Sequence, residues 1–283
     1  MKHGIGLAAA GEWGPQTLAE AAALAEEAGW DGIFLEDYIT HWAGNDVPTY
    51  DPWISLAAMA MKTRRIILGI AVTPLSRRRP WKLARESVTL DHLSNGRLIV
   101  GIGIGGINDP NNFDKFGEVT DIRERAIMVA EALDILNGLW GGEPFTYQGK
   151  YYQVEEVTFL PKPVQTPRIP IWIGGGWPLM GPKQRAARWD GSCLYKHTYG
   201  GPWQDMTPDD VRTLKGFMES HRESSTPFDI VIGGRERSSD WEMEKAYIKD
   251  LEEAGATWWM EYVEPSELSA MKARIERGPL RID

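Results

Sequence analysis

The sequence predicts an α/β fold, and within that class a (β/α)8 TIM barrel. Short apolar runs rich in β-branched residues alternate with longer segments of helical periodicity from one end of the chain to the other, which is the order of a parallel sheet joined by crossover helices. Eight such units can be counted, and that number favours closure into a barrel over an open doubly wound sheet. A chain of 283 residues with 42% hydrophobic content suits a single domain over residues 1–283.

The predicted strands are mostly continuous apolar runs, as expected of strands buried on both faces. They cover residues 4–8, 32–35, 66–72, 98–104, 169–173, 192–194, 229–232 and 258–262. Helical spacing predicts helices at 15–28, 53–63, 82–93, 122–136, 179–188, 208–221, 240–254 and 267–275. In the first of these, Leu18, Ala21, Ala22 and Ala25 share a face and Pro15 suits the first turn.

Residues 144–170 interrupt this alternation. The run from 147 to 152 is a candidate hairpin, and the four prolines that follow it prevent a helix. We therefore expect an insertion before the fifth strand.

Composition excludes several classes of function. The net charge of -9, with no basic block beyond residues 77–79, disfavours a nucleic-acid partner. No stretch approaches the roughly 18 apolar residues of a membrane span, and no signal peptide precedes the first strand, so we expect a cytoplasmic protein that does not bind membranes. Cys193 is the only cysteine and the five histidines are dispersed, so we expect no disulfide and no metal site.

In a barrel of this type the active site lies at the carboxyl ends of the strands. The second strand is followed by Glu36, Asp37, Tyr38 and, in the next turn, His41. Asp37, Tyr38 and His41 are the candidate catalytic residues, since a carboxylate can orient a ligand or act as a base and a phenol or imidazole can transfer a proton. Glu36 is expected instead to cap the loop or to pair with a cation at the rim.

Three further strand ends are candidates for holding a ligand. The third strand ends in Ala71, Val72 and Thr73, and the fourth carries Gly103, Ile104 and Gly105. Alternate glycines leave one face of a strand bare, so a flat ring can lie against the backbone; tight strand packing is the alternative explanation. The run is a weak dinucleotide fingerprint, because no helix opens soon after its glycines.

Glycines also follow the fifth strand. Gly174, Gly175 and Gly176 precede a predicted helix, an arrangement that can bind a phosphate through backbone amides. A plain turn is the alternative explanation.

In combination, these strand ends resemble the bacterial-luciferase-like family of flavin-dependent oxidoreductases. The segments that carry the resemblance are 35–37, 63–69, 79–80, 90–97, 113–117, 123–125, 139–140, 161–165 and 170–175. The resemblance extends over residues 4–195 and depends on the order of these segments more than on any one of them.

The resemblance implies a homodimeric barrel with a flavin over the strand ends. The ring would lie near Ala71, Val72 and Thr73, where family members often show a non-prolyl cis peptide, and near residues 103–105. The phosphate would lie by residues 174–176, with Arg125 nearby. Relatives commonly carry an acid followed by His after the second strand, whereas this chain has Asp37 and Tyr38.

Two cofactors fit such a family. One is reduced FMN, used with oxygen by monooxygenases that depend on a flavin reductase as partner; the other is the deazaflavin coenzyme F-420 (F420), which passes only hydride. Deazaflavin users often have Thr and Glu where this chain has Ile104 and Gly106, which favours FMN. We therefore expect a monooxygenase that acts on a small organic substrate. The alternatives are an F420-dependent oxidoreductase, a non-catalytic flavin-binding barrel, or a hydrolase or lyase on the same fold.

Overall fold

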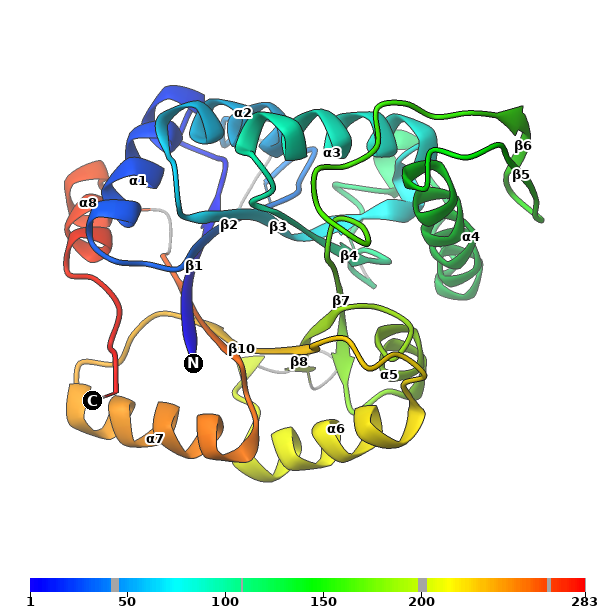
Figure 1. The fold of residues 1–283 in the computed structure, drawn as a ribbon. Helices are drawn as coiled ribbons and strands as arrows, with labels where there is room; N and C mark the ends of the chain where they lie inside the picture. Colours follow the sequence, from blue (N-terminus) through cyan, green and yellow to red (C-terminus); the bar gives the residue numbers. More distant parts are fainter. Residues whose placement is uncertain (42–45, 108, 198–202, 264–265, 283) are drawn as a thin grey trace.

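The computed structural model describes residues 1–41, 46–107, 109–197, 203–263 and 266–282. Its barrel strands are β1 (Lys2–Ala8), β2 (Gly32–Glu36), β3 (Ile67–Pro74), β4 (Leu98–Gly103), β7 (Ile171–Trp177), β8 (Gly191–His197), β10 (Asp229–Arg235) and β11 (Trp258–Tyr262). They run parallel in the order β10-β11-β1-β2-β3-β4-β7-β8, and β10 pairs back to β8. The predicted barrel, with all eight of its strands, is therefore confirmed (Figure 1).

The helices lie around the outside of this barrel (Figure 1). They are α1 (Pro15–Glu27), α2 (Pro52–Lys62), α3 (Pro80–Ser94), α4 (Ile122–Trp140), α5 (Met180–Ala186), α6 (Pro208–His221), α7 (Trp241–Ala254) and α8 (Leu268–Glu276). Side-chain caps fix several of their starts: the Asp51 carboxylate accepts the Ile54 N–H at the start of α2, and Thr207 forms a capping box with Asp210 at the start of α6. Every predicted helix is present.

The insertion before the fifth barrel strand is the hairpin of β5 (Phe145–Gln148) and β6 (Gln153–Val157), which projects beyond α4 (Figure 1). Two buried carboxylates tether this segment to the barrel helices. Glu131 of α4 accepts the backbone N–H groups of residues 150–152 at 2.7–3.1 Å, and Asp91 of α3 accepts those of Val164 and Gln165 at 2.7 and 3.1 Å. The predicted insertion is thus an ordered part of the fold.

One sequence expectation about the fifth barrel strand is wrong. Residues 174–176 were expected in a turn ahead of a helix, but β7 continues through them to Trp177 and pairs in parallel with residues 193–196 of β8. α5 starts only at Met180, after the Trp177–Pro178 peptide. Glycine has a low strand propensity in general, but the backbone here is held by the neighbouring strand.

Aromatic rings fill the barrel interior toward the amino ends of the strands. Phe34, Trp172 and Trp258 are fully buried, and their ring centroids lie 5.1–5.7 Å apart. Gly191 makes room for this packing, because a Cβ there would lie 2.3 Å from Cδ1 of Trp172. We call Phe34, Trp172 and Trp258 the aromatic plug; it leaves only the carboxyl ends of the strands for a ligand.

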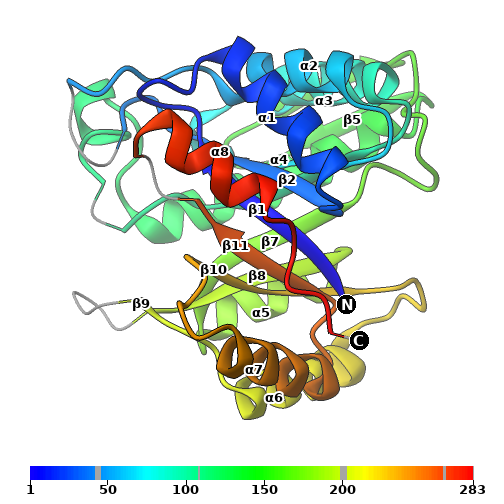
Figure 2. The same ribbon diagram turned by 90° about the vertical axis from the view of Figure 1, so that its left-hand side faces the viewer.

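Figure 2 shows the barrel from the side, with the carboxyl ends of the strands on the left and both chain termini on the right. β9 (Trp203–Gln204) pairs antiparallel to the end of β8 on the left side. We call this open end of the barrel the mouth. Across the parts of the chain described above, no helix combines the length and apolar character needed to cross a membrane.

Candidate functional site

One wall of the mouth is formed by three adjacent strands, β3, β4 and β7. The side chain of Val72, on β3, lies at the centre of this wall. A Cβ added to Gly103 of β4 would lie 2.9 Å from Cγ2 of Val72, and one added to Gly174 of β7 would lie 2.8 Å from its Cγ1. The bare faces of both strands thus contact the Val72 side chain. The structure therefore brings together three residues that the sequence selected separately, and the Ala71–Val72 peptide is cis, as the resemblance implied.

The other residues predicted to bind the cofactor differ in their exposure and in the side of the strand that they face. Ala71, Ile104 and Gly105 are partly exposed at the mouth, and Thr73 is fully buried. A Cβ on Gly176 would meet only Leu179, at 3.4 Å, whereas one on Gly175 would lie 2.7 Å from Cβ of Pro182 in α5. We call the surface formed by Ala71, Val72 and Gly176 the ring wall. Gly175 faces away from it. Ile104 packs against the core outside the barrel, and a Cβ on Gly105 would lie 2.3 Å from Cζ of Phe113.

Arg125 is held by the loop after β4. It is 2% exposed, its guanidinium donates to the carbonyls of Val119 at 2.6 Å and Gly106 at 2.7 Å, and its Cζ lies 3.5 Å from the ring centroid of Phe113. These contacts brace the loop beside the ring wall. Binding of a phosphate by Arg125 stays a prediction.

Asp37 lies at the centre of a charged cluster behind β2. Its carboxylate accepts from Arg78 Nε and Nη2, both at 2.9 Å, from Arg77 Nη2 at 3.0 Å, and from the Thr73 hydroxyl. Burial by itself would raise the pKa of Asp37, but the charges of Arg78 and Arg77 and these hydrogen bonds outweigh it, so the pKa lies below its ordinary value. A carboxylate held in this way is a poor proton acceptor. Its geometry is that of an anchor joining β2 to the turn after β3.

Glu36, the preceding residue, has the opposite surroundings. Tyr262, the last residue of β11, donates its hydroxyl to Oε2 at 3.0 Å, and Tyr38 donates to Oε1 at 3.3 Å. Burial raises the pKa of Glu36 to about 7, although both hydrogen bonds act to lower it. Burial and the charge of Glu36 raise the pKa of Tyr38 well above its usual range, so this phenol stays protonated. A carboxyl group that titrates near neutral pH is suited to general acid–base chemistry.

His41 joins this cluster through a ring contact. Its ring centroid lies 5.7 Å from that of Tyr38 at an interplanar angle of 74°, and its backbone N–H donates to the Thr49 hydroxyl at 3.1 Å. Burial lowers the pKa of His41, which favours the neutral imidazole at pH 7. Of the three predicted catalytic residues, Tyr38 and His41 thus lie together, and Asp37 belongs to the cluster behind them.

Sequence reasoning missed two members of this site. Glu36 was expected to pair with a cation at the rim, but within the described residues it forms no ion pair. Tyr262 was not selected, although it ends the eighth barrel strand. Active-site residues of such barrels lie at the carboxyl ends of the strands. Tyr262 ends a predicted strand just as Tyr38 follows one, so this position in the sequence could have identified Tyr262.

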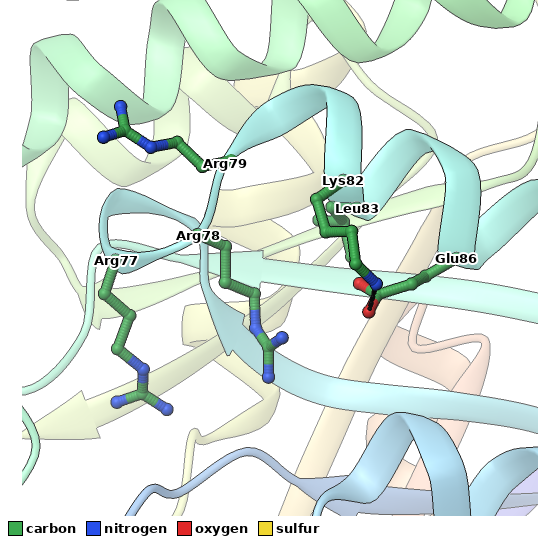
Figure 3. Close-up of a pocket in the computed structure, with 6 residues that line it drawn as sticks. All are labelled: Arg77, Arg78, Arg79, Lys82, Leu83 and Glu86. Carbon is green, nitrogen blue, oxygen red and sulfur yellow. Dashed lines mark hydrogen bonds and ion pairs between the residues drawn. The ribbon is translucent and has the colours of Figure 1, made fainter.

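A separate hollow of about 200 Å³ lies beside the start of α3 and is lined by basic residues (Figure 3). Arg78 is taken by Asp37, and Lys82 pairs with Glu86 of the same helix. The cations of this hollow are therefore largely neutralised, and the chemically active groups lie at the barrel mouth.

Comparisons with known proteins agree with this fold. A family model described as luciferase-like monooxygenase matches residues 3–190. An F420-dependent glucose-6-phosphate dehydrogenase from Microbacterium testaceum is 36% identical over 176 residues, which are 59% of this chain and 49% of that protein. This chain spans about half the length of the curated relatives it matches.

Solved structures give the same architecture. An F420-dependent secondary alcohol dehydrogenase in complex with an F420-acetone adduct superposes with a TM-score of 0.77 at 17% identity, covering 100% of this chain and 99% of that one. A monooxygenase from Streptomyces bottropensis gives a TM-score of 0.76 at 19% identity, covering 97% and 96%. At sequence identities this low, the similarity of these structures shows a shared fold.

Proposed function

Because this chain belongs to the luciferase-like monooxygenase family, we propose that it is an oxidoreductase that uses F420 to move a hydride to or from a small organic molecule. The names of the curated relatives, which are F420-dependent dehydrogenases, support F420 over FMN. This reverses the preference for FMN drawn from Ile104 and Gly106, since relatives at 30% identity or more are stronger support than two positions.

The ring wall fits a flat tricyclic ring. It combines two partly exposed apolar side chains, those of Ala71 and Val72, with bare backbone at Gly176. When bound, the deazaflavin supplies the hydride chemistry that no side chain can perform. Val72 would support the face of its ring, and the loop braced by Arg125 would keep water from its edge.

One observation carries the proposal: a carboxyl group bonded by two phenols lies next to this wall, and burial raises its pKa. Glu36 follows the Leu35–Ile70 pair in the register of β2 and β3, which places it beside the Ala71–Val72 peptide. Oxidation of an alcohol to a carbonyl releases a proton together with the hydride, and the reverse reaction consumes both. A site for this reaction needs an apolar surface for the ring and a proton carrier beside it, and both are present.

The test is to titrate the purified protein with F420, FMN and FAD and to follow binding by fluorescence. We expect F420 to bind most tightly. The F420-loaded protein should then bleach or restore the deazaflavin absorbance with members of a panel of alcohols and carbonyl compounds. Tight FMN binding with no F420 binding would contradict the proposal.

Ile104 and Gly106 favour a second candidate function, an FMN-dependent monooxygenase. Gly106 is exposed and offers no carboxylate at the position where deazaflavin users often have Glu. Such an enzyme would need a flavin reductase as partner to supply reduced FMN. Oxygen consumption that depends on reduced FMN and on substrate would support it.

We also propose that the protein acts as a homodimer in the cytoplasm. Exposed apolar side chains on α2 support an interface there, since Ile54 is 66% exposed and Met61 64%. Sedimentation velocity should give a dimer for the native chain and a monomer for the Ile54→Lys, Met61→Lys double variant. A monomeric native protein would contradict this proposal.

A further inference from the structure

Among the residues that the structure describes, Glu36 is bonded by neutral donors and by no cation. Its two oxygens accept from the phenols of Tyr262 and Tyr38 at 3.0 and 3.3 Å. The adjacent Asp37 takes both nearby guanidinium groups, those of Arg77 and Arg78. Of these two consecutive carboxyl groups, Asp37 therefore contacts the positive charges and Glu36 contacts the phenols.

Tyr262 contacts Glu36 across the intervening strand, at a glycine. β1 lies between β11 and β2, so Tyr262 must reach across it to meet Glu36. Gly6 pairs with Tyr262 in the register of β1 and β11, and a Cβ at Gly6 would lie 3.6 Å from Cδ2 of Tyr262. The ring thus lies over bare backbone at Gly6. A larger side chain there would push the phenol away from Glu36.

We propose that Glu36, held by Tyr262 and Tyr38, is the proton carrier for the substrate of this enzyme, an inference that rests on the proposed hydride-transfer function. In alcohol oxidation, the O–H bond of the substrate breaks and its proton passes to the Glu36 carboxylate. The C–H bond of the same carbon breaks, its hydride leaves to the oxidised deazaflavin, and the carbonyl double bond forms. In carbonyl reduction, protonated Glu36 returns the proton to the oxygen while the carbon receives the hydride.

The two phenols have a defined part in this exchange. Each donates a hydrogen bond that favours the charged carboxylate, so together they restrain the rise in the Glu36 pKa that burial causes. The phenol of Tyr38 does not titrate near neutral pH, because burial and the charge of Glu36 raise its pKa. Tyr262 and Tyr38 are therefore positioning residues.

Two other titratable groups among the described residues act on Tyr38, the phenol that contacts Glu36. The charge of Asp109, in the loop after β4, acts on Tyr38 and raises its pKa further, and the His41 ring contacts Tyr38. β1 and β3 place Gly6, Ala8 and Ala71 next to Glu36. We therefore expect one carboxyl titration in this region near neutral pH.

The first test uses the cofactor-free protein. Carbon-13 NMR of glutamate-labelled protein should show one side-chain carboxyl that titrates near neutral pH and disappears in Glu36→Gln. In Tyr262→Phe the same signal should titrate at higher pH, because a hydrogen bond that favours the charged form is lost. An unchanged neutral-pH signal in Glu36→Gln would overturn the assignment.

The second test measures turnover. Glu36→Gln keeps the shape and the acceptor but cannot carry the proton, so F420 affinity should be unchanged while kcat falls by about 10²–10⁴-fold. Glu36→Asp should recover part of the rate, and Tyr262→Phe should shift the pH profile of kcat/KM upward.

The outcomes separate the two proposals. If the native protein turns over F420 and Glu36→Gln does so at the native rate with the native pH profile, the proton-carrier inference is wrong and the hydride-transfer function stands. If the native protein binds no F420, both are wrong, whatever the NMR titration shows.

Discussion

Glu36 and Asp37 are neighbours in the chain, yet their carboxyl groups face opposite environments. Asp37 accepts from Arg78 at 2.9 Å and Arg77 at 3.0 Å, whereas Glu36 accepts from the phenols of Tyr262 and Tyr38. Strand alternation causes the difference, because successive side chains of β2 point to opposite faces of the sheet. The pKa of one carboxyl is lowered and that of the other is raised, which is how a pair of acids acquires different tasks.

The stability of the fold should depend on the titration of Glu36. Its folded-state pKa of about 7 lies above its ordinary value of 4.5. The stabilisation is therefore fully present below the ordinary value and is lost as the pH rises through 7. We expect Glu36→Gln to be more stable than the native protein at about pH 8, by up to roughly 3 kcal/mol, and to match it near pH 5. Urea unfolding at both pH values checks this; a difference that does not change with pH would contradict it.

Asp37→Asn should mainly destabilise the fold. Asparagine would leave the buried guanidinium of Arg77 without its anion and would take from the partly exposed Arg78 its nearest one. Breaking a buried pair costs about 3–5 kcal/mol. The stabilisation from the lowered Asp37 pKa is present above its ordinary value of 3.8 and is lost as the pH falls through the folded-state pKa. Chemical denaturation measures the loss. Asp134→Asn is the matched control: its partner Arg188 is 60% exposed, so it should cost less than about 1 kcal/mol. Equal effects of the two changes would contradict the anchor role.

Two adjacent glycines of β7 should respond differently to one added methyl group. In Gly176→Ala the new Cβ meets only Leu179 at 3.4 Å, so the melting temperature should stay near native. The methyl group enters the ring wall, and we expect F420 or FMN to bind roughly tenfold more weakly. In Gly175→Ala the Cβ lies 2.7 Å from Pro182, so the melting temperature should fall while the folded protein binds normally. Calorimetric melting with cofactor titration distinguishes the variants, and unchanged binding by Gly176→Ala would remove that residue from the site.

Uncharged substrates should be preferred over their phosphate esters. Three cations near the carboxyl ends of β3, β8 and β10 are held by carboxylates: Arg78 by Asp37, Lys196 by Asp210 at 2.8 Å, and Arg235 by Glu244 at 3.0 Å. A phosphate would have to compete with these anions, so we expect kcat/KM for glucose 6-phosphate to be at least about tenfold below that for a simple secondary alcohol.

A matched variant sharpens this test. Asp210→Asn releases Lys196 and should narrow the difference between phosphorylated and uncharged substrates. If the native protein prefers glucose 6-phosphate, the mouth has a phosphate site that these ion pairs do not reveal.

The barrel could be predicted from the sequence because its signal is local and repeated. Each strand–helix unit carries its own apolar run and periodicity, and eight units leave few topologies. The end of β7 could not be predicted in the same way. Glycines 174–176 resemble a turn, and the strand continues there because these residues pair with β8 in the closed barrel.

The proton-carrying cluster shows a different limit. Tyr38 and His41 were found because they follow Glu36 closely in sequence, but Tyr262 lies 226 positions from Glu36. Burial, not residue type, also sets the Glu36 pKa, and burial depends on the closed barrel. Sequence patterns therefore located both acids at the mouth, but the partners of each carboxyl group depend on the closed barrel.

The aromatic plug has a kinetic consequence. With Phe34, Trp172 and Trp258 filling the barrel toward the amino ends of its strands, whatever binds at the mouth shares one route in and out. A cofactor whose ring lies against β3, β4 and β7 must then arrive before the substrate and depart after the product. Steady-state turnover should accordingly follow an ordered sequence, in which the reduced cofactor competes with the oxidised cofactor for the free enzyme.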